Sequence, residues 1–181
     1  VFLASQPHAV LFSPCNTGPL FFSNQLLTLH DLSFKFYPAY NHFLFSAWYN
    51  FLVVRLCRKV KHIFTVSESI KAEIMLHYQI AANKISVTYN GIADNMRMNS
   101  RLKLQKEKII LTVGSFHQRK NMNMLIKAFS SADLAPQYSL VAIGKSNAIF
   151  LNSSGKAYNG IQLIQDADDA MLKDYYANAE I

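Results

Sequence analysis

The sequence predicts an α/β protein in which short parallel strands alternate with helices. Two observations support this fold class. Short apolar runs of β-forming residues recur between helical stretches, and the same alternation restarts after a polar, basic stretch at residues 93–108. That stretch has no periodic apolar face, so it is the best candidate for a linker. We therefore expect one domain over residues 1–95, a linker over 96–107 and a second domain over 108–181.

In the first domain the strands are expected at residues 9–13, 26–30, 62–67 and 85–89, because these runs are short, apolar and rich in β-forming residues. A helix is expected from about residue 41 to 59. A second helix should follow Ser67, which is placed to act as its N-cap. The last strand runs into Asn90-Gly91, which is a turn signal.

The second domain repeats this pattern. Strands are expected at residues 108–114, 138–144 and 161–165, and amphipathic helices at 121–132 and 168–179. The order strand, helix, strand, strand, helix is that of the start of a Rossmann-like domain.

Composition narrows the class of protein. With 51% hydrophobic and 16% charged residues, the chain is too apolar for intrinsic disorder. Its two cysteines cannot form a disulfide framework, which fits a reducing compartment, and no Cys/His cluster indicates zinc. The net charge is +7, but the aromatic residues sit in apolar runs rather than beside a basic stripe, so we expect no nucleic-acid partner.

The longest apolar stretch runs from Phe43 to Cys57 and is too short to cross a bilayer. A helix packed in the core is the simplest interpretation. A helix lying on a membrane surface is the alternative, because basic residues gather at its end: Arg55, Arg58, Lys59 and Lys61. Basic residues at a helix C-terminus also suit the helix dipole.

The segment from Val113 to Asn121 follows a buried strand and opens a helix. Gly114 allows a tight exit from the strand, and Arg119 and Lys120 stand at the helix start. Cations are unfavourable at that end of a helix, so the pair makes more sense if a phosphate or diphosphate occupies the site. The alternative is a solvated pair beside an Asn121 cap.

A second candidate is His30-Asp31 at the carboxyl end of a strand, the edge that faces ligands in open α/β sheets. His30 could donate to a sugar hydroxyl or act as an acid or base. Alternatively, His30 is simply hydrogen-bonded at the strand end and Asp31 caps the next turn. A metal site would need further ligands, and none lies at convincing spacing.

Other strand ends carry weaker candidates. Ser67 could serve only as an N-cap and Asn90-Gly91 only as a turn. The loop at residues 13–19 could shape a substrate pocket. Gly144 and Lys145 end a further strand, and Lys145 could face the same crevice.

Six segments, in order, resemble the GT-B glycosyltransferases of family 4: residues 28–34, 63–74, 84–92, 110–129, 140–145 and 168–181. Within that family the chain looks most like bacterial mannosyltransferases of polysaccharide assembly. The resemblance implies two Rossmann-like domains, of which the second is incomplete here. The chain starts at Val1 and stops where an apolar segment begins, so we expect it to be a piece of a longer protein.

The resemblance also implies site residues. Arg119 and Lys120 would contact the donor diphosphate and stabilise the charge on the leaving nucleotide, with no metal or other cofactor required. His30 would lie near the transferred sugar. The expected donor-binding residues are Gly114, Ser115, Asn121, Gly144 and Lys145, and the expected acceptor or cleft residues are Asp31, Ser67, Asn90 and Gly91. Some relatives carry an Arg where this chain has Ser115.

The resemblance implies transfer of a sugar with retention of its anomeric configuration. The donor would be a GDP- or UDP-sugar, with mannose as the sugar in the mannosyltransferases that the chain resembles. The acceptor would be a saccharide or a lipid-linked saccharide in the cytoplasm. Lipid-linked acceptors and the positive charge suggest peripheral contact with the inner membrane face. The family's acidic loop is absent, so we expect this chain to be inactive alone. The alternatives are a non-catalytic or degenerate glycosyltransferase-like binding module and another Rossmann-type enzyme.

Overall fold

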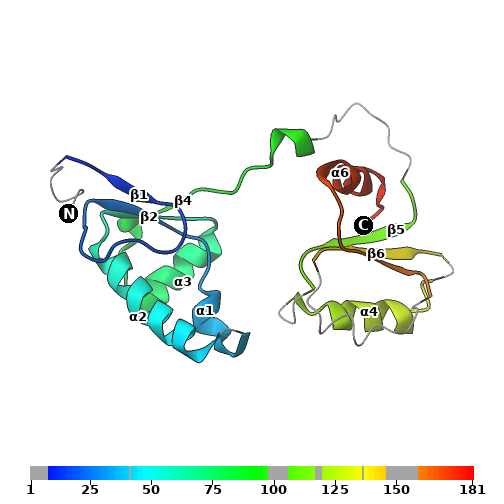
Figure 1. The fold of residues 1–181 in the computed structure, drawn as a ribbon, viewed down its shortest axis with the longest axis horizontal. Helices are drawn as coiled ribbons and strands as arrows, with labels where there is room; N and C mark the ends of the chain where they lie inside the picture. The colour runs from blue at the N-terminus through cyan, green and yellow to red at the C-terminus, as the bar shows by residue number, and fades with distance from the viewer. Residues whose placement is uncertain (1–7, 41, 98–105, 117–119, 136, 146–158) are drawn as a thin grey trace. The chain divides into compact units, whose positions relative to one another are not determined.

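The computed structural model describes residues 8–40, 42–97, 106–116, 120–135, 137–145 and 159–181. The chain forms two compact units, Val1–Gly91 and Ile92–Ile181. The division therefore falls slightly before residue 95, where the sequence analysis ended the first domain. Each unit contains its own parallel sheet (Figure 1).

The first unit is built on a four-stranded parallel sheet in the order β1-β2-β3-β4. Its helices α1, α2 and α3 lie on one side of this sheet (Figure 1). The strands are β1 (Leu11–Ser13), β2 (Gln25–Leu29), β3 (His62–Thr65) and β4 (Ile85–Val87), and the helices are α1 (Ser33–Phe36), α2 (Phe43–Lys59) and α3 (Glu68–Tyr78), with short 3-10 helices at Pro38–Tyr40 and Ala82–Lys84. All four predicted strands and both predicted helices are present, whereas α1 was not foreseen.

The core of the first unit forms where the helices cover the sheet. Leu27 and Leu29 of β2 and Ile63 of β3 are fully buried, and Val53 and Leu56 of α2 pack into the same cluster. Burying a side chain of this size contributes roughly 1.5–3 kcal/mol to folding. The packed-helix interpretation of residues 43–57 therefore holds for one face of α2.

Helix α3 begins as predicted: the Ser67 hydroxyl accepts a hydrogen bond from the Ile70 amide at 3.2 Å. The turn predicted at Asn90-Gly91 is wrong. The Thr88 amide donates to the Thr65 carbonyl at 2.7 Å, which prolongs the pairing of β4 with β3 and leads the chain onward. No turn is assigned between residues 88 and 93.

The second unit has a three-stranded parallel sheet in the order β5-β6-β7, with α4 and α6 on opposite faces (Figure 1). Its strands are β5 (Ile109–Val113), β6 (Ser139–Ile143) and β7 (Ile161–Ile164), and its helices are α4 (Met122–Ser131) and α6 (Asp169–Asn178), with a 3-10 helix at Asp94–Met96. These are the five elements that the sequence predicted. Beyond α6, the chain returns along the free edge of β5, where Leu111 N donates to Ile181 O at 2.7 Å.

One apolar face of α4 forms the core of this unit. Ile126 and Phe129 of α4 pack against Leu140 and Ala142 of β6, and Phe116 joins them from the loop after β5. Because side chains alternate along a strand, Val141 points to the opposite face, where α6 lies.

The polar stretch predicted as a linker is attached to α6 on both sides of residues 98–105, which lie outside the described residues. Before this gap, Asn95 Nδ2 donates to Asp169 Oδ2 at 2.9 Å. After it, Lys106 Nζ donates to the carbonyls of Ala177 and Ala179 at the end of α6. A lysine there suits the negative end of the helix dipole.

Candidate functional site

The carboxyl ends of β5 and β6 contact each other through backbone atoms rather than side chains. Gly144 lies directly against Gly114, and a Cβ on Gly144 would come within 2.6 Å of the Gly114 carbonyl carbon. Gly114 N donates to Ile143 O at 2.9 Å, and Phe116 N donates to Lys145 O at 3.0 Å. The loop after β5 thus crosses the end of β6 in close contact, which only glycine at position 144 permits.

Two lysines lie at this edge of the sheet. Lys145 follows β6 and Lys120 precedes α4, and both are exposed. Neither ammonium has an ion-pair partner among the residues that the structure describes. Arg119, the other predicted phosphate ligand, falls outside the described residues. These lysines, with exposed Ser115, form a cationic, sterically open edge that can accept an anion.

The start of α4 adds to the positive potential. Asn121 occupies the N-cap position in a left-handed conformation (φ 52°), but its side chain makes no cap hydrogen bond. Its amide instead donates to Met124 Sδ at 3.2 Å. The Asn121 side chain therefore contacts the first turn without accepting from one of its N–H groups, so the alternative of an Asn121 side-chain cap is wrong. The helix has no acidic residue there, so its N–H groups keep their attraction for an anion.

In the first unit the candidate His30 is tied to the loop between β1 and β2. His30 Nε2 lies 2.8 Å from Pro14 O, and His30 N donates to Asn16 Oδ1 at 2.8 Å. A carbonyl can only accept, so Nε2 must carry the proton. In the neutral ring Nδ1 is then an acceptor, and the exposed imidazole presents a lone pair rather than a proton.

The remaining candidates of the first unit have local structural roles or none. Asp31 Oδ1 accepts from Ser33 N at 2.9 Å and so caps the turn before α1, as the simpler interpretation expected. Ser67 caps α3. Asn90 and Gly91 are exposed beyond β4, and a Cβ on Gly91 would meet no atom within 4 Å.

Sequence reasoning missed Asn16, the residue that organises the end of β2. Its backbone N donates to Thr28 O at 2.9 Å, and its side-chain oxygen accepts from His30 N. Asn16 thus satisfies the backbone groups at the end of β2 that a neighbouring strand would otherwise bond. Asn16 is in the left-handed conformation (φ 53°), which asparagine tolerates better than most residues. The sequence did offer a signal for this role: Asn16 lies in a loop bounded by proline and glycine, where asparagine often adopts turn conformations.

Three groups of the first unit have shifted pKa values: Cys57 and Tyr78 in the core, and the partly buried Lys84 directly before β4. Burial raises the pKa of the Cys57 thiol to about 12 and also raises the pKa of Tyr78, whereas burial lowers the pKa of Lys84. A thiol held protonated is inert, so Cys57 is not a nucleophile.

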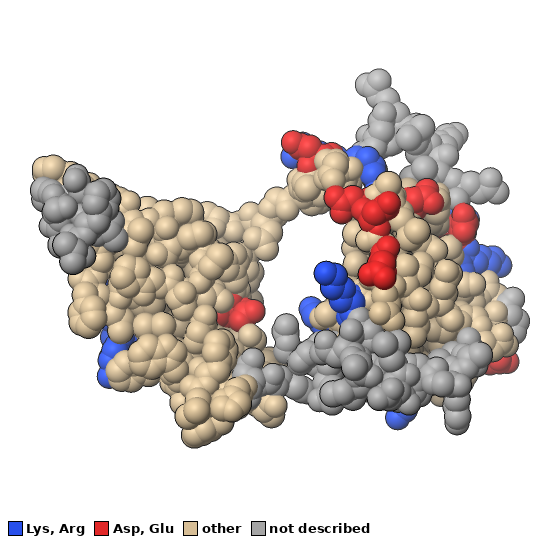
Figure 2. Space-filling view, viewed as in Figure 1, with Lys and Arg blue, Asp and Glu red and all other residues tan. Residues whose placement is uncertain are grey.

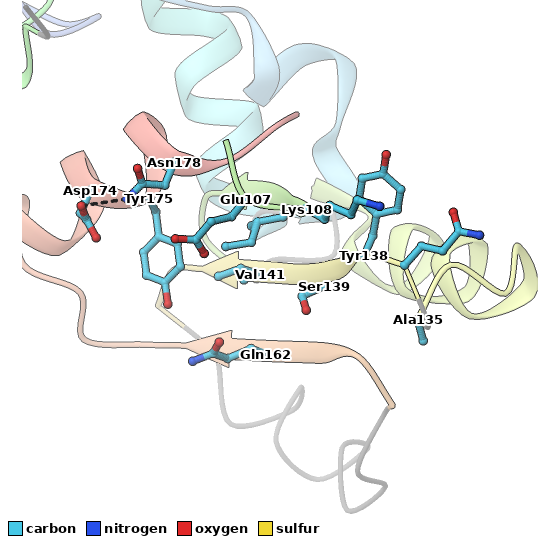
Figure 3. Close-up of a pocket in the computed structure, with 12 residues that line it drawn as sticks. Glu107, Lys108, Ala135, Tyr138, Ser139, Val141, Gln162, Asp174, Tyr175 and Asn178 are labelled. Carbon is cyan, nitrogen blue, oxygen red and sulfur yellow. Dashed lines mark hydrogen bonds between the residues drawn. The ribbon is translucent and has the colours of Figure 1, made fainter. Parts of the chain in front are cut away.

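A cavity of about 510 Å³ opens in the second unit between α6 and the sheet (Figure 3). Ile109 and Ser139, which begin β5 and β6, line it, together with Asp174, Tyr175 and Asn178 of α6. It therefore lies at the amino ends of the strands, opposite the edge at which α/β sheets bind ligands. Among the described residues no group of three or more His, Cys, Asp or Glu could hold a metal ion.

Part of the amino-acid sequence is similar to known glycosyltransferases. Residues 23–95 match the Glycosyltransferase Family 4 model. Over 104 residues the chain is 33% identical to the O-antigen chain mannosyltransferase RfbU of Salmonella typhimurium, a match that covers 58% of this chain and 28% of that protein.

Solved structures show the same fold. WaaG, a glycosyltransferase involved in lipopolysaccharide biosynthesis, superposes with a TM-score of 0.67 over 99% of this chain and 54% of that one, at 14% identity. A glycosyltransferase from Rickettsia africae gives 0.51 over 85% of this chain and 43% of that one, at 17% identity. The chain thus spans about half the length of these structures. Residues 23–95 thus resemble the family 4 glycosyltransferases, and the two units have the fold of the GT-B glycosyltransferases.

Proposed function

We propose that this chain carries part of a retaining, metal-independent glycosyltransferase that moves a sugar, mannose by the likeness to RfbU, from a nucleoside-diphosphate sugar to a saccharide or lipid-linked acceptor. The acceptor belongs to cell-surface polysaccharide synthesis, and the enzyme works in the cytoplasm, at the inner membrane face. The family match and the likeness to a lipopolysaccharide glycosyltransferase support the reaction class.

The observation that carries the proposal is the edge formed by the ends of β5 and β6. A Cβ on Gly114 would meet no atom within 4 Å, so the end of β5 is open and a diphosphate can approach its backbone closely. Lys120 and Lys145 supply positive charge there with no anionic partner among the described residues. Charge that grows on a leaving nucleoside diphosphate is stabilised by such fixed cations and helix N–H groups.

His30 contributes at the sugar in this proposal. With Nε2 held by Pro14 O, the neutral ring accepts through Nδ1 and can orient a sugar hydroxyl by accepting its proton in a hydrogen bond. It acts there as a positioning group rather than as the acid that protonates the leaving group. Asn121, Ser115 and Lys145 are proposed donor contacts, and Asp31, Ser67, Asn90 and Gly91 border the acceptor side.

The test is Lys120→Ala in the protein expressed from its complete reading frame. Loss of one electrostatic contact to the developing charge typically lowers the rate about 100- to 1,000-fold, and kcat/KM for sugar transfer should fall by that factor. Lys127→Ala is the matched control, because Lys127 is an exposed lysine on α4, the helix that Lys120 precedes. Rates that stay equal in the two variants would remove Lys120 from the donor site.

A non-catalytic binding module is the second candidate, favoured by the structural roles of Asp31 and Ser67. Such a module would bind a nucleoside diphosphate without turnover. Calorimetry with GDP and UDP on the same two lysine variants separates it from the enzyme: binding that depends on Lys120, with no transfer to any acceptor, supports the module.

A further inference from the structure

The cavity between α6 and the sheet of the second unit lies apart from the proposed donor edge. It opens at Ile109 and Ser139, which begin β5 and β6, whereas the donor edge lies beyond Val113 and Ile143, which end these strands. Ile109 and Val113 are about 13 Å apart along β5, at about 3.3 Å per residue. A group bound in the cavity would therefore be separate from the sugar nucleotide. The cavity volume of about 510 Å³ falls in the range of small-molecule sites.

Part of the cavity wall is apolar. Tyr175 is half-buried and points from α6 towards the sheet, where Val141 of β6 is 2% exposed (Figure 3). An aromatic ring beside a branched aliphatic side chain offers a surface on which C–H groups can pack. The adjacent Tyr176 belongs to the same helix, but it is 46% exposed and is not among the residues that line the cavity. The two neighbouring tyrosines therefore differ in just this respect.

The remaining wall carries polar groups that are available to a ligand. Gln162 of β7 and Ser139 of β6 are exposed, and neither side chain bonds to another residue that the structure describes. On α6, Asn178 Nδ2 donates to Asp174 Oδ1 at 3.0 Å, which leaves Asn178 Oδ1 and Asp174 Oδ2 as acceptors (Figure 3). Amide, hydroxyl and carboxylate groups thus present both donors and acceptors to the cavity.

The charge around the cavity disfavours an anionic ligand. Glu107 and Asp174 line it against one cation, Lys108, whose Nζ lies 6.0 Å from the centre of the Tyr138 ring. Residues 166–181 hold five Asp and Glu against one Lys, and Figure 2 shows Asp and Glu side chains gathered around α6. A phosphate would therefore be repelled. An apolar ligand would also bind poorly, because it would bury these polar groups without partners.

A neutral ligand with both C–H faces and many hydroxyl groups satisfies all of these conditions. We propose that the cavity is a second saccharide-binding site, separate from the site of transfer. Tyr175 packs on the C–H face of a sugar ring, Gln162 exchanges hydrogen bonds with its hydroxyl groups, and Asp174 accepts from them. The inference rests on the proposed function in one respect, because an enzyme that extends a saccharide meets this ligand. A saccharide chain held here would stay at a raised effective concentration for the next transfer.

Titration with mannotriose tests the site. Saturation-transfer NMR on the saccharide measures binding to the 181-residue chain and to the protein expressed from its complete reading frame. Nitrogen-15 spectra of the 181-residue chain locate the contact. We expect saturable binding to both proteins, with shifts of the Gln162 side-chain amide and of the peptide groups of β7. Absence of saturable binding, or shifts confined to Gly114 and Lys145 at the opposite edge, would overturn the proposal.

Variants then test the apolar and the polar wall separately. Tyr175→Ala should weaken mannotriose binding about tenfold through the lost ring contact, and Tyr176→Ala on the same helix is its matched control. Gln162→Ala should weaken binding about fivefold through lost hydrogen bonds. Gln165→Ala is its control, because Gln165 is exposed just beyond β7 and does not line the cavity. Circular dichroism checks that each variant is folded, and the exposed Gln162 keeps the test open if Tyr175→Ala unfolds. Controls that weaken binding as much as their partners would contradict the assignment.

Other occupants of the cavity give distinguishable results. Binding to the 181-residue chain but not to the complete protein would assign the cavity to the protein's own chain and overturn the proposal. Binding of GDP that Tyr175→Ala abolishes, without binding of mannotriose, would assign it to an anion and overturn the proposal as well. The titration with mannotriose contains no sugar nucleotide, so its failure leaves the transferase proposal standing. Inactivity of the complete protein with intact mannotriose binding would contradict the transferase alone.

Discussion

The two units place different chemistry at the same edge of their sheets. In the first unit the strand ends are closed by side chains: His30 bonds to Pro14 O, Asp31 caps α1 and Ser67 caps α3. In the second unit Gly114 leaves the end of β5 open, and Gly144 packs directly against the Gly114 backbone.

The lysines of the second unit, Lys120 and Lys145, have no ion-pair partner among the described residues. The contrast teaches that a polar residue at the end of a parallel strand is not by itself a ligand site. A glycine beside open space, such as Gly114, is the stronger indication when exposed cations lie nearby, because a phosphate can approach its backbone.

The largest effect on stability is expected from a substitution that breaks the backbone contact between Gly114 and Gly144 in the second unit. Gly144→Ala places a methyl group against the Gly114 carbonyl, which no side-chain movement can relieve, so we expect a loss of about 3 kcal/mol in the stability of that unit. Hydrogen exchange of the β5 and β6 peptides measures it. Gly91→Ala is the control from the first unit, because a Cβ there meets no atom within 4 Å. Equal protection in the two variants would show that the contact is not tight.

A smaller effect concerns the buried thiol of the first unit. Burial raises the pKa of Cys57 from 9.0 to about 12, so the folded thiol stays protonated while the unfolded thiol ionises from about pH 9. Its stabilising contribution is therefore complete below pH 9 and declines as the pH rises towards 12, by at most about 1.4 kcal/mol per pH unit. The lowered pKa of Lys84 acts in the opposite direction, but that ammonium is only partly buried.

Urea unfolding followed by Trp48 emission measures this decline in the first unit alone, because that unit holds the only tryptophan. Cys57→Ala should flatten the pH dependence between pH 9 and 10.5, whereas Cys15→Ala should not, since Cys15 is exposed. A dependence that is identical in the two variants would exclude the Cys57 thiol as its source.

The smallest effect is expected from substitutions at the N-cap positions of α3 and α4. Ser67→Ala removes a side-chain cap and should cost about 1 kcal/mol in the first unit. Asn121→Gly should leave the second unit's stability unchanged, because Asn121 does not cap α4 and glycine accepts its left-handed backbone. In the complete protein only the Asn121 variant should raise the KM for the sugar nucleotide. The reverse pattern would contradict the comparison of the two units.

Much of this molecule could be predicted from its sequence. The strands and long helices followed from apolar runs and helical periodicity, since each depends on residues close together in the chain. The cap of α3 by Ser67 followed for the same reason. The segment after β5 was also singled out correctly as a strand-to-helix loop with a glycine at the strand end.

The tertiary structure alone decided how those elements use their polar residues. Asn16 and His30 are fourteen positions apart and meet only because β1 and β2 are adjacent, and Gly114 meets Gly144 only because β5 and β6 pair. The exposure of Leu44, Trp48 and Phe51 had the same origin: the first half of α2 is apolar or aromatic on every side, so its sequence does not show which side the sheet will cover. Local pattern therefore determines the elements, whereas pairing and packing between distant segments determine which of their residues remain available for chemistry.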